Sequence, residues 1–141
     1  MREKQVGIDF NRHARRAATP EGRILRSVRD SIEADFGFNL HDQGTRTAGD
    51  DGPVVAIALL APAADEERSW GPFRLSAGHL AGVIAATLEP DLGRRMARYV
   101  DVFTPRAFGV NMQLWGTSTV LFESGLLAGD PQKQELRKLN V

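Results

Sequence analysis

The chain contains one unbroken apolar run of strand length, Val54-Val55-Ala56-Ile57-Ala58-Leu59-Leu60. An apolar run that does not alternate with polar residues is typical of a β-strand covered on both faces, as in a sheet between two layers of helices. Residues 43–53 and 63–73 on either side have the Gly, Pro and charged composition of loops. The run is too short to span a bilayer. It therefore predicts a buried central strand.

Upstream of this run, one helix and one strand are predicted. Thr19-Pro20-Glu21 is a helix start, with a hydroxyl N-cap, Pro at the first helical position and an acid in the first turn. Apolar residues continue at helical spacing to Ile32, and we expect the helix to end near Asp35. Phe36, Phe38 and Leu40 then alternate as in a strand, with His41 at its end.

Further elements are predicted along the rest of the chain. They are a short strand at 6–10, a helix capped by Ser76 and ended by Pro90, a short helix at 92–99, a β-rich run from Thr117 to Phe122 and a last helix capped by Asp130-Pro131. Strands that alternate with helices predict an α/β layered fold, with a mixed, largely parallel sheet flanked by helices. No linker divides residues 1–141, so we expect a single domain.

Composition excludes several classes of function. The 141 residues are 42% hydrophobic, and 18 basic residues balance 18 acidic ones. Because the net charge is zero, the chain as a whole has no positive electrostatic field of the kind that attracts nucleic acids, which argues against that mode of binding. The absence of Cys excludes disulfides, thiolate zinc sites and cysteine nucleophiles. The N-terminus has no apolar segment of the kind found in signal peptides, and no membrane partner is predicted.

Side chains suited to chemistry follow three of the predicted strands. They are the Asn11-Arg12 pair, His41 and Glu123. In open α/β sheets, ligands bind outside the carboxyl ends of the strands, so these residues are expected to share one site. His41 is the best metal candidate, because imidazole is a common zinc ligand. A hydrogen-bonded surface or core histidine is its simpler interpretation.

The other candidates also have two interpretations. Glu123 is suited to general acid/base work, or is a solvent-facing acid at a strand end. The Arg12 guanidinium, beside Asn11, suits bidentate binding of a carboxylate, or lies on the surface.

Three motifs in order give the chain a family resemblance. They are Gly7-Ile8-Asp9-Phe10-Asn11-Arg12, Phe38-Asn39-Leu40-His41-Asp42-Gln43 and the stretch from Gly116 to Gly125 that contains Glu123-Ser124-Gly125. In this order they resemble the C-terminal half of the catalytic domain of zinc metallocarboxypeptidases, the carboxypeptidase A-like family, in a bacterial branch. The resemblance implies proteolysis by a hydrolase that removes C-terminal residues from peptides or proteins.

The resemblance also implies a role for each candidate. His41 matches a ligand of the single zinc ion, Glu123 the catalytic general acid/base, and Asn11-Arg12 the pair that binds the substrate carboxylate. Tyr99, the only tyrosine, matches a mobile tyrosine that covers the substrate, with a packing role as the alternative. Side-chain preference is expected to depend on residues between Tyr99 and Glu123, with Asn111, Gln113 and Trp115 as candidates.

One expected motif is missing. The family supplies two zinc ligands through His-x-x-Glu before the Asn-Arg pair, and no His-x-x-Glu occurs in this chain. The chain is therefore expected to be the C-terminal part of such a domain, with self-association through exposed sheet edges. The alternatives are a non-catalytic remnant or pseudoenzyme that binds peptide termini or a partner chain, and a new metal site in which His13 or His79 joins His41.

Overall fold

The computed structural model describes residues 3–4, 8–9, 14–17 and 19–140. The Asn11-Arg12 pair and His13 lie outside the described residues. The strand predicted at 6–10 is described only at Ile8–Asp9, which forms β2 and pairs antiparallel with β1 (Glu3–Lys4). No helix in these described parts combines the length and the apolar character needed to cross a membrane.

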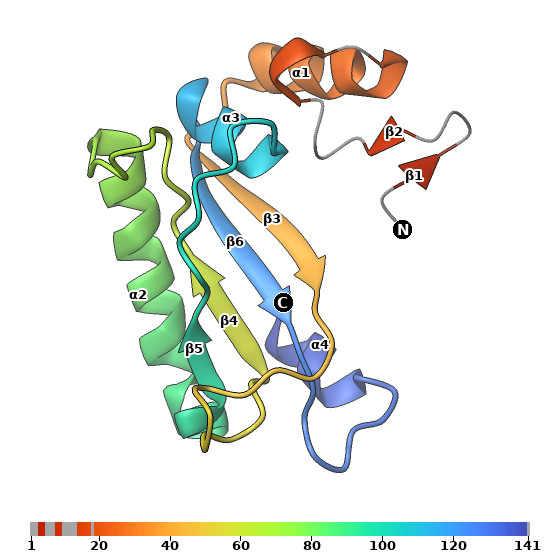
Figure 1. Cartoon of the computed structure of the whole chain (residues 1–141), viewed down its shortest axis with the longest axis vertical. Helices are drawn as coiled ribbons and strands as arrows, with labels where there is room; N and C mark the ends of the chain where they lie inside the picture. The colour runs from red at the N-terminus through yellow and green to blue at the C-terminus, as the bar shows by residue number, and fades with distance from the viewer. Residues whose placement is uncertain (1–2, 5–7, 10–13, 18, 141) are drawn as a thin grey trace.

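A four-stranded mixed sheet forms the centre of the fold (Figure 1). Its strands are β3 (Phe36–Asp42), β4 (Ile57–Leu60), β5 (Met96–Arg98) and β6 (Ser118–Ser124), in the order β3-β6-β4-β5. β3 is parallel to β6, β5 is parallel to β4, and β4 and β6 are antiparallel. All four residues of β4 are buried, as its apolar composition predicted. The predicted α/β fold with a mixed sheet is confirmed.

Helices lie on both faces of this sheet. They are α1 (Pro20–Ile32), α2 (Pro72–Leu92), α3 (Phe108–Leu114) and α4 (Gln134–Leu139), with 3-10 turns at Ala14–Arg16 and Gly93–Arg95. The main core lies between α2 and the sheet, where Ile57, Leu59, Val120 and Phe122 meet Ala77, Leu88 and Leu92, and Leu136 of α4 completes it. Alternate residues of the strands face away from this core, toward α3 and the segment after β5.

The start of α1 is the best-predicted element boundary. The Thr19 hydroxyl accepts a hydrogen bond from the Gly22 amide at 3.1 Å, and Pro20 occupies the first turn. The helix ends at Ile32, three residues before the predicted end, because Glu33 adopts a left-handed conformation with φ of 51°.

The second helix was predicted with the wrong ends. α2 begins at Pro72 rather than after Ser76, because proline suits the first helical position. It also continues past Pro90 to Leu92, so Pro90 does not end it.

Two further predictions in the second half were wrong. No separate helix forms at 92–99: Leu92 ends α2, a 3-10 turn and strand β5 occupy 93–98, and pairing with β4 overrides local propensity. Helix α3 was not predicted. The last helix starts at Gln134, later than predicted, although Asp130 accepts hydrogen bonds from the amides of Gln134 and Leu136 at 2.7 and 2.9 Å.

Candidate functional site

The register of two parallel strands brings His41 and Glu123 side by side. β3 and β6 pair with His41 opposite Glu123, so their side chains leave the same face of the sheet. His41 Nδ1 lies 3.4 Å from Glu123 Oε1. The Glu123 side chain is 7% exposed and the His41 side chain 21%. A largely buried carboxylate is therefore in contact with a partly open imidazole.

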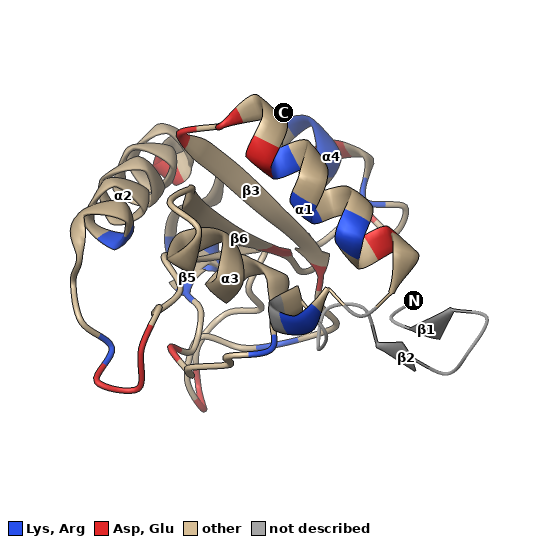
Figure 2. Ribbon diagram, turned by 90° about the horizontal axis from the view of Figure 1, so that it is seen from above, with Lys and Arg blue, Asp and Glu red and all other residues tan. Residues whose placement is uncertain are grey.

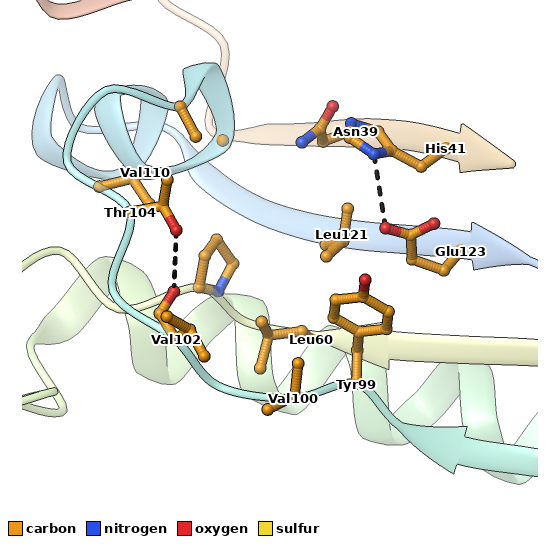
Figure 3. Close-up of a pocket in the computed structure, with 13 residues that line it drawn as sticks. Asn39, His41, Leu60, Tyr99, Val100, Val102, Thr104, Val110, Leu121 and Glu123 are labelled. Atoms are coloured by element: carbon orange, nitrogen blue, oxygen red, sulfur yellow. Dashed lines mark hydrogen bonds and ion pairs between the residues drawn. The ribbon is translucent and has the colours of Figure 1, made fainter. Parts of the chain in front are cut away.

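Tyr99 reaches the same pocket from the other edge of the sheet. It follows β5 directly, and its amide donates to the Leu59 carbonyl at 2.9 Å, which continues the pairing with β4. Figure 3 shows its ring directed toward the side of the pocket that holds His41 and Glu123. Three of the five residues predicted to form one site thus line one cavity, and they come from three different strands or strand ends.

The cavity has a volume of about 240 Å³ and a largely apolar wall. Besides the three residues named above, its lining consists of Asn39, Leu60, Pro62, Val100, Val102, Thr104, Ala107, Gly109, Val110 and Leu121. None of these side chains carries a charge, so the acidic side chain of the lining is Glu123 and its imidazole is His41. Apolar walls around a few convergent polar groups are typical of sites for small ligands.

The turn after Glu123 explains the sequence Glu-Ser-Gly. A Cβ at Gly125 would lie 2.0 Å from the Val55 carbonyl oxygen, so no residue with a side chain fits there without moving the backbone. The Gly125 amide donates to the Ala56 carbonyl at 2.7 Å. Gln43 Nε2 lies 3.5 Å from the Glu123 carbonyl oxygen. These contacts fix the backbone that carries Glu123.

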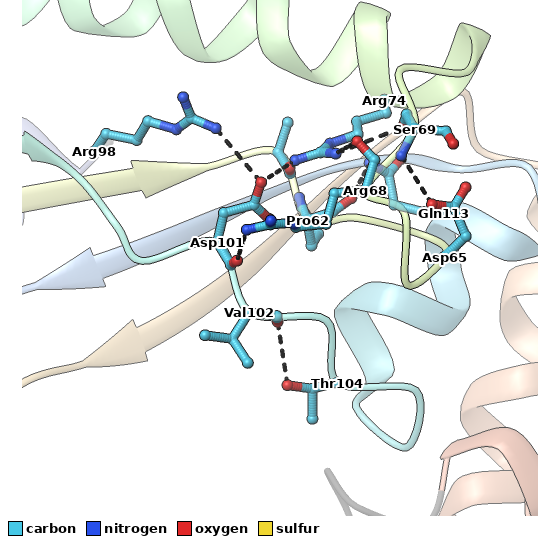
Figure 4. A network of polar contacts seen from close by, with 11 residues as sticks. Pro62, Asp65, Arg68, Ser69, Arg74, Arg98, Asp101, Val102, Thr104 and Gln113 are labelled. Carbon is cyan, nitrogen blue, oxygen red and sulfur yellow. Dashed lines mark hydrogen bonds and ion pairs between the residues drawn. The ribbon is translucent and has the colours of Figure 1, made fainter.

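A buried arginine, which the sequence analysis did not identify, holds the wall of the pocket after Tyr99. Arg74 is 3% exposed, and its guanidinium contacts Asp101 Oδ2 at 2.5 Å (Figure 4). It also donates to the carbonyls of Ala61, at 3.1 Å, and Arg68, at 2.5 Å. An arginine in the first turn of a helix suggests a solvated residue, and its burial is explained by Asp101 together with these backbone carbonyls.

The three residues proposed to set the side-chain preference have structural roles instead. Asn111 is 1% exposed and donates to the Pro105 and Ala107 carbonyls. Gln113 is 2% exposed and links the Pro62 carbonyl to the Thr119 amide. Trp115 packs edge-on against Phe108 at 6.5 Å. None of the three lines the pocket.

The described residues do not by themselves fit a catalytic zinc site. Such a site needs three protein ligands and an open position. Across residues 14–17 and 19–140, no group of three His, Asp or Glu side chains is arranged to hold a metal ion. His79 is exposed on α2 and does not line the pocket, and His13 is outside the described residues. His41 and Glu123 are the two potential ligands in the cavity.

Comparison with known proteins adds no assignment. No protein-family model, curated protein or solved structure matches this chain.

Proposed function

We propose that the His41–Glu123–Tyr99 pocket belongs to a peptide hydrolase of the metallocarboxypeptidase type, which removes the last residue of a peptide or protein. The observation that carries the proposal is the 3.4 Å contact between His41 and Glu123, on the floor of a cavity that Tyr99 also lines. These three side chains are the ones that the sequence motifs singled out for ligand binding, proton transfer and substrate covering.

Glu123 is the group suited to proton transfer. A water molecule attacks the peptide carbonyl carbon while the carboxylate takes its proton, and the C–N bond breaks as that proton passes to the leaving amine. The His41 imidazole next to Glu123 Oε1 limits the orientations of the carboxylate. Asn11 and Arg12 are proposed to bind the terminal carboxylate of the substrate, because a guanidinium offers paired donors to it.

The proposal includes a zinc ion only if further protein ligands join His41. His41 is the proposed metal ligand of this chain, and the others have to come from outside the described residues. The check is zinc content per chain after dialysis, for the wild-type protein and for His41→Ala. A bound ion that is lost in the variant would support the metal site, and an equal zinc content in both proteins would contradict a role for His41.

The test of catalysis is Glu123→Gln, which keeps the shape of the side chain and removes its ability to accept a proton. We expect cleavage of an N-blocked peptide to fall by about 10²–10⁴-fold, the usual contribution of a general acid/base. Glu135→Gln is the matched control, because Glu135 is an exposed residue of α4 with its side chain 61% accessible. Equal rates for the two variants would contradict the role of Glu123.

A second function, binding of peptide termini without hydrolysis, is favoured by one observation. With Glu123 as the proton-transfer group, the described part of the pocket offers His41 as a metal ligand, and catalysis by zinc needs two more. In that case the wild-type chain and Glu123→Gln would both bind a peptide with a free terminal carboxylate, measured by calorimetry, and neither would cleave it.

A further inference from the structure

The outer edge of β3 exposes an unusual amount of apolar side chain. β3 is the first strand of the sheet, and among the described residues only β6 pairs with it. Phe36, Phe38 and Leu40, which share one face of the strand, are 49%, 55% and 68% exposed. In Figure 1 β3 forms one side of the sheet, with no described strand beyond it. Exposed edges of this kind are templates for pairing with another strand.

The apolar surface extends from this edge onto two helices. Leu25, Val28 and Ile32 of α1 line one groove with Phe36 and Phe38, and Val83 of α2 lines a second groove with Phe38 and Leu40. We call these seven side chains the β3 edge patch. They are 40–68% exposed. Five of the seven residues are aliphatic, so we take roughly 150 Å² for each fully exposed residue, the lower end of the aromatic range, and the patch then exposes on the order of 600 Å².

That area matches what a protein interface requires. Soluble monomers rarely expose contiguous apolar patches larger than a few hundred Å². A stable protein–protein interface buries about 800 Å² on each partner. The β3 edge patch is therefore large enough to form most of one side of an interface between two chains.

The backbone of β3 is arranged for antiparallel pairing with itself. The Ser118 amide donates to the Asp35 carbonyl and the Gln43 amide to the Ser124 carbonyl, so the odd-numbered residues of this segment face β6. The N–H and C=O groups of the even-numbered residues 36–42 point outward, because these groups alternate along a strand. If two copies of β3 are related by a two-fold axis beside Asn39, each even-numbered residue of one copy lies opposite an even-numbered residue of the other. The outward N–H and C=O groups of the two strands can then form hydrogen bonds with each other.

We propose that the β3 edge patch binds a second copy of this chain, so that two β3 strands pair antiparallel about Asn39 and form one continuous eight-stranded sheet. In this register Phe38 lies opposite Leu40 of the second copy, on the same face. Cross-strand pairs of aromatic and aliphatic side chains stabilise antiparallel strands.

The charge distribution favours this occupant. Residues 36–40 contain neither a charged residue nor Pro, the devices that protect natural edge strands, and Figure 2 shows β3 uncoloured along most of its length between charged helices. The chain has a formal net charge of zero, so two copies approach without net repulsion. On the other face of the paired strands, Gly37 of one copy lies opposite His41 of the second copy. The glycine has no side chain and leaves room for the imidazole.

The first test is the molar mass of the chain in solution, measured by sedimentation over a wide range of concentration. We expect twice the 15.5 kDa of one chain at high concentration. Leu40→Lys places a charge in the apolar face and should give a monomer. Leu114→Lys is the matched control, because Leu114 on α3 is also exposed, at 52%, and is not part of the patch. A monomer at every concentration, or a dimer that survives Leu40→Lys, would overturn the proposal.

The second test checks the register. Opposite residues of a pair without hydrogen bonds have Cα atoms about 4.5 Å apart, within the range that a disulfide spans. The chain has no natural cysteine, so Asn39→Cys introduces a single thiol at the two-fold axis. We expect mild oxidation to link the variant into a covalent dimer, while Leu114→Cys does not link. Equal linking of both variants, or none of either, would exclude pairing about Asn39. Circular dichroism of each variant verifies that it is folded.

Discussion

At the scale of single residues, burial separates the side chains that hold the structure from those that face the pocket. Arg74 and Glu123 are both charged and almost completely buried, but their surroundings differ. Arg74 is surrounded by acceptors that match its guanidinium, as Figure 4 shows. Glu123 instead contacts the partly open imidazole of His41 and faces a cavity that Tyr99 also lines. We therefore expect Arg74 to act in stability, and the proposed chemistry falls to Glu123.

Replacing Arg74 by Met should destabilise the fold strongly. The substitution leaves the Ala61 and Arg68 carbonyls without the Arg74 donor, and leaves the Asp101 carboxylate with only the longer contact from Arg98, in a largely buried site. Removing one partner of such a pair costs about 3 kcal/mol or more of unfolding free energy. Urea denaturation measures this cost.

Arg98→Met is the matched control for that experiment. Arg98 contacts the same Asp101 oxygen at 3.5 Å, but its side chain is 66% exposed. Exposed pairs contribute at most about 1 kcal/mol. Equal losses of stability in the two variants would show that the buried network has no special role.

At the scale of elements, α1 is attached by polar rather than apolar contacts. Its apolar residues Leu25, Val28 and Ile32 remain 40–65% exposed. Arg29 instead donates to the Trp115 carbonyl and, at 3.1 Å, to the Thr117 hydroxyl. The Arg26 guanidinium lies 4.0 Å from the centre of the Trp115 ring. A helix that buries little apolar surface is expected to open more readily than the sheet.

Arg29→Ala should therefore loosen α1 and leave the sheet intact. We expect faster amide hydrogen exchange over residues 20–32 in the variant, with unchanged exchange in β4 and β6. The reason is that the core between α2 and the sheet does not include α1. Hydrogen exchange followed by mass spectrometry resolves these segments.

Asp30→Asn is the control for Arg29→Ala. Hydrogen bonds from Arg26 and then from Arg29 hold the pKa of Asp30 below its ordinary value of 3.8. These pairs are therefore intact at neutral pH and are lost only as the pH falls through the lowered pKa. Removing the Asp30 charge leaves Arg29 bonded to Trp115 and Thr117, so α1 should exchange almost as in the wild type. If Asp30→Asn loosens α1 as much as Arg29→Ala does, the attachment through Arg29 is contradicted.

A comparison of the elements shows which sequence signals were sufficient to predict secondary structure. The cap at Thr19 and the apolar run that contains β4 depend on neighbouring residues alone, and both were predicted correctly. β5 exists because Met96–Arg98 pairs with β4, and such pairing over a long distance leaves no local signal. For the site, the position of His41 and Glu123 at the ends of predicted strands made them candidates. The contact between their side chains depends on the register of β3 and β6, which the sequence does not reveal. Arg74 could not be predicted, since its partner Asp101 is 27 residues away.

At the scale of the whole molecule, the sheet has two faces with different tasks. One face packs against α2 and α4 and forms the core, while the other faces the pocket with His41, Glu123 and Tyr99 (Figures 1 and 3). Pairing about Asn39 would extend both faces across two chains. The strand that supplies His41 would then also form the interface, so the proposed dimer and the proposed site both depend on β3.

The central claim is that the pocket acts on the carboxyl ends of peptides, and one measurement tests it most directly. Release of the last residue, and binding by calorimetry, are measured for two peptides of identical sequence, one with a free terminal carboxylate and one with a terminal amide, in the presence of zinc. We expect the chain to cleave or bind the free acid and to ignore the amide, because only the acid offers a carboxylate to Asn11 and Arg12. Equal treatment of both peptides, or no interaction with either, would contradict the claim.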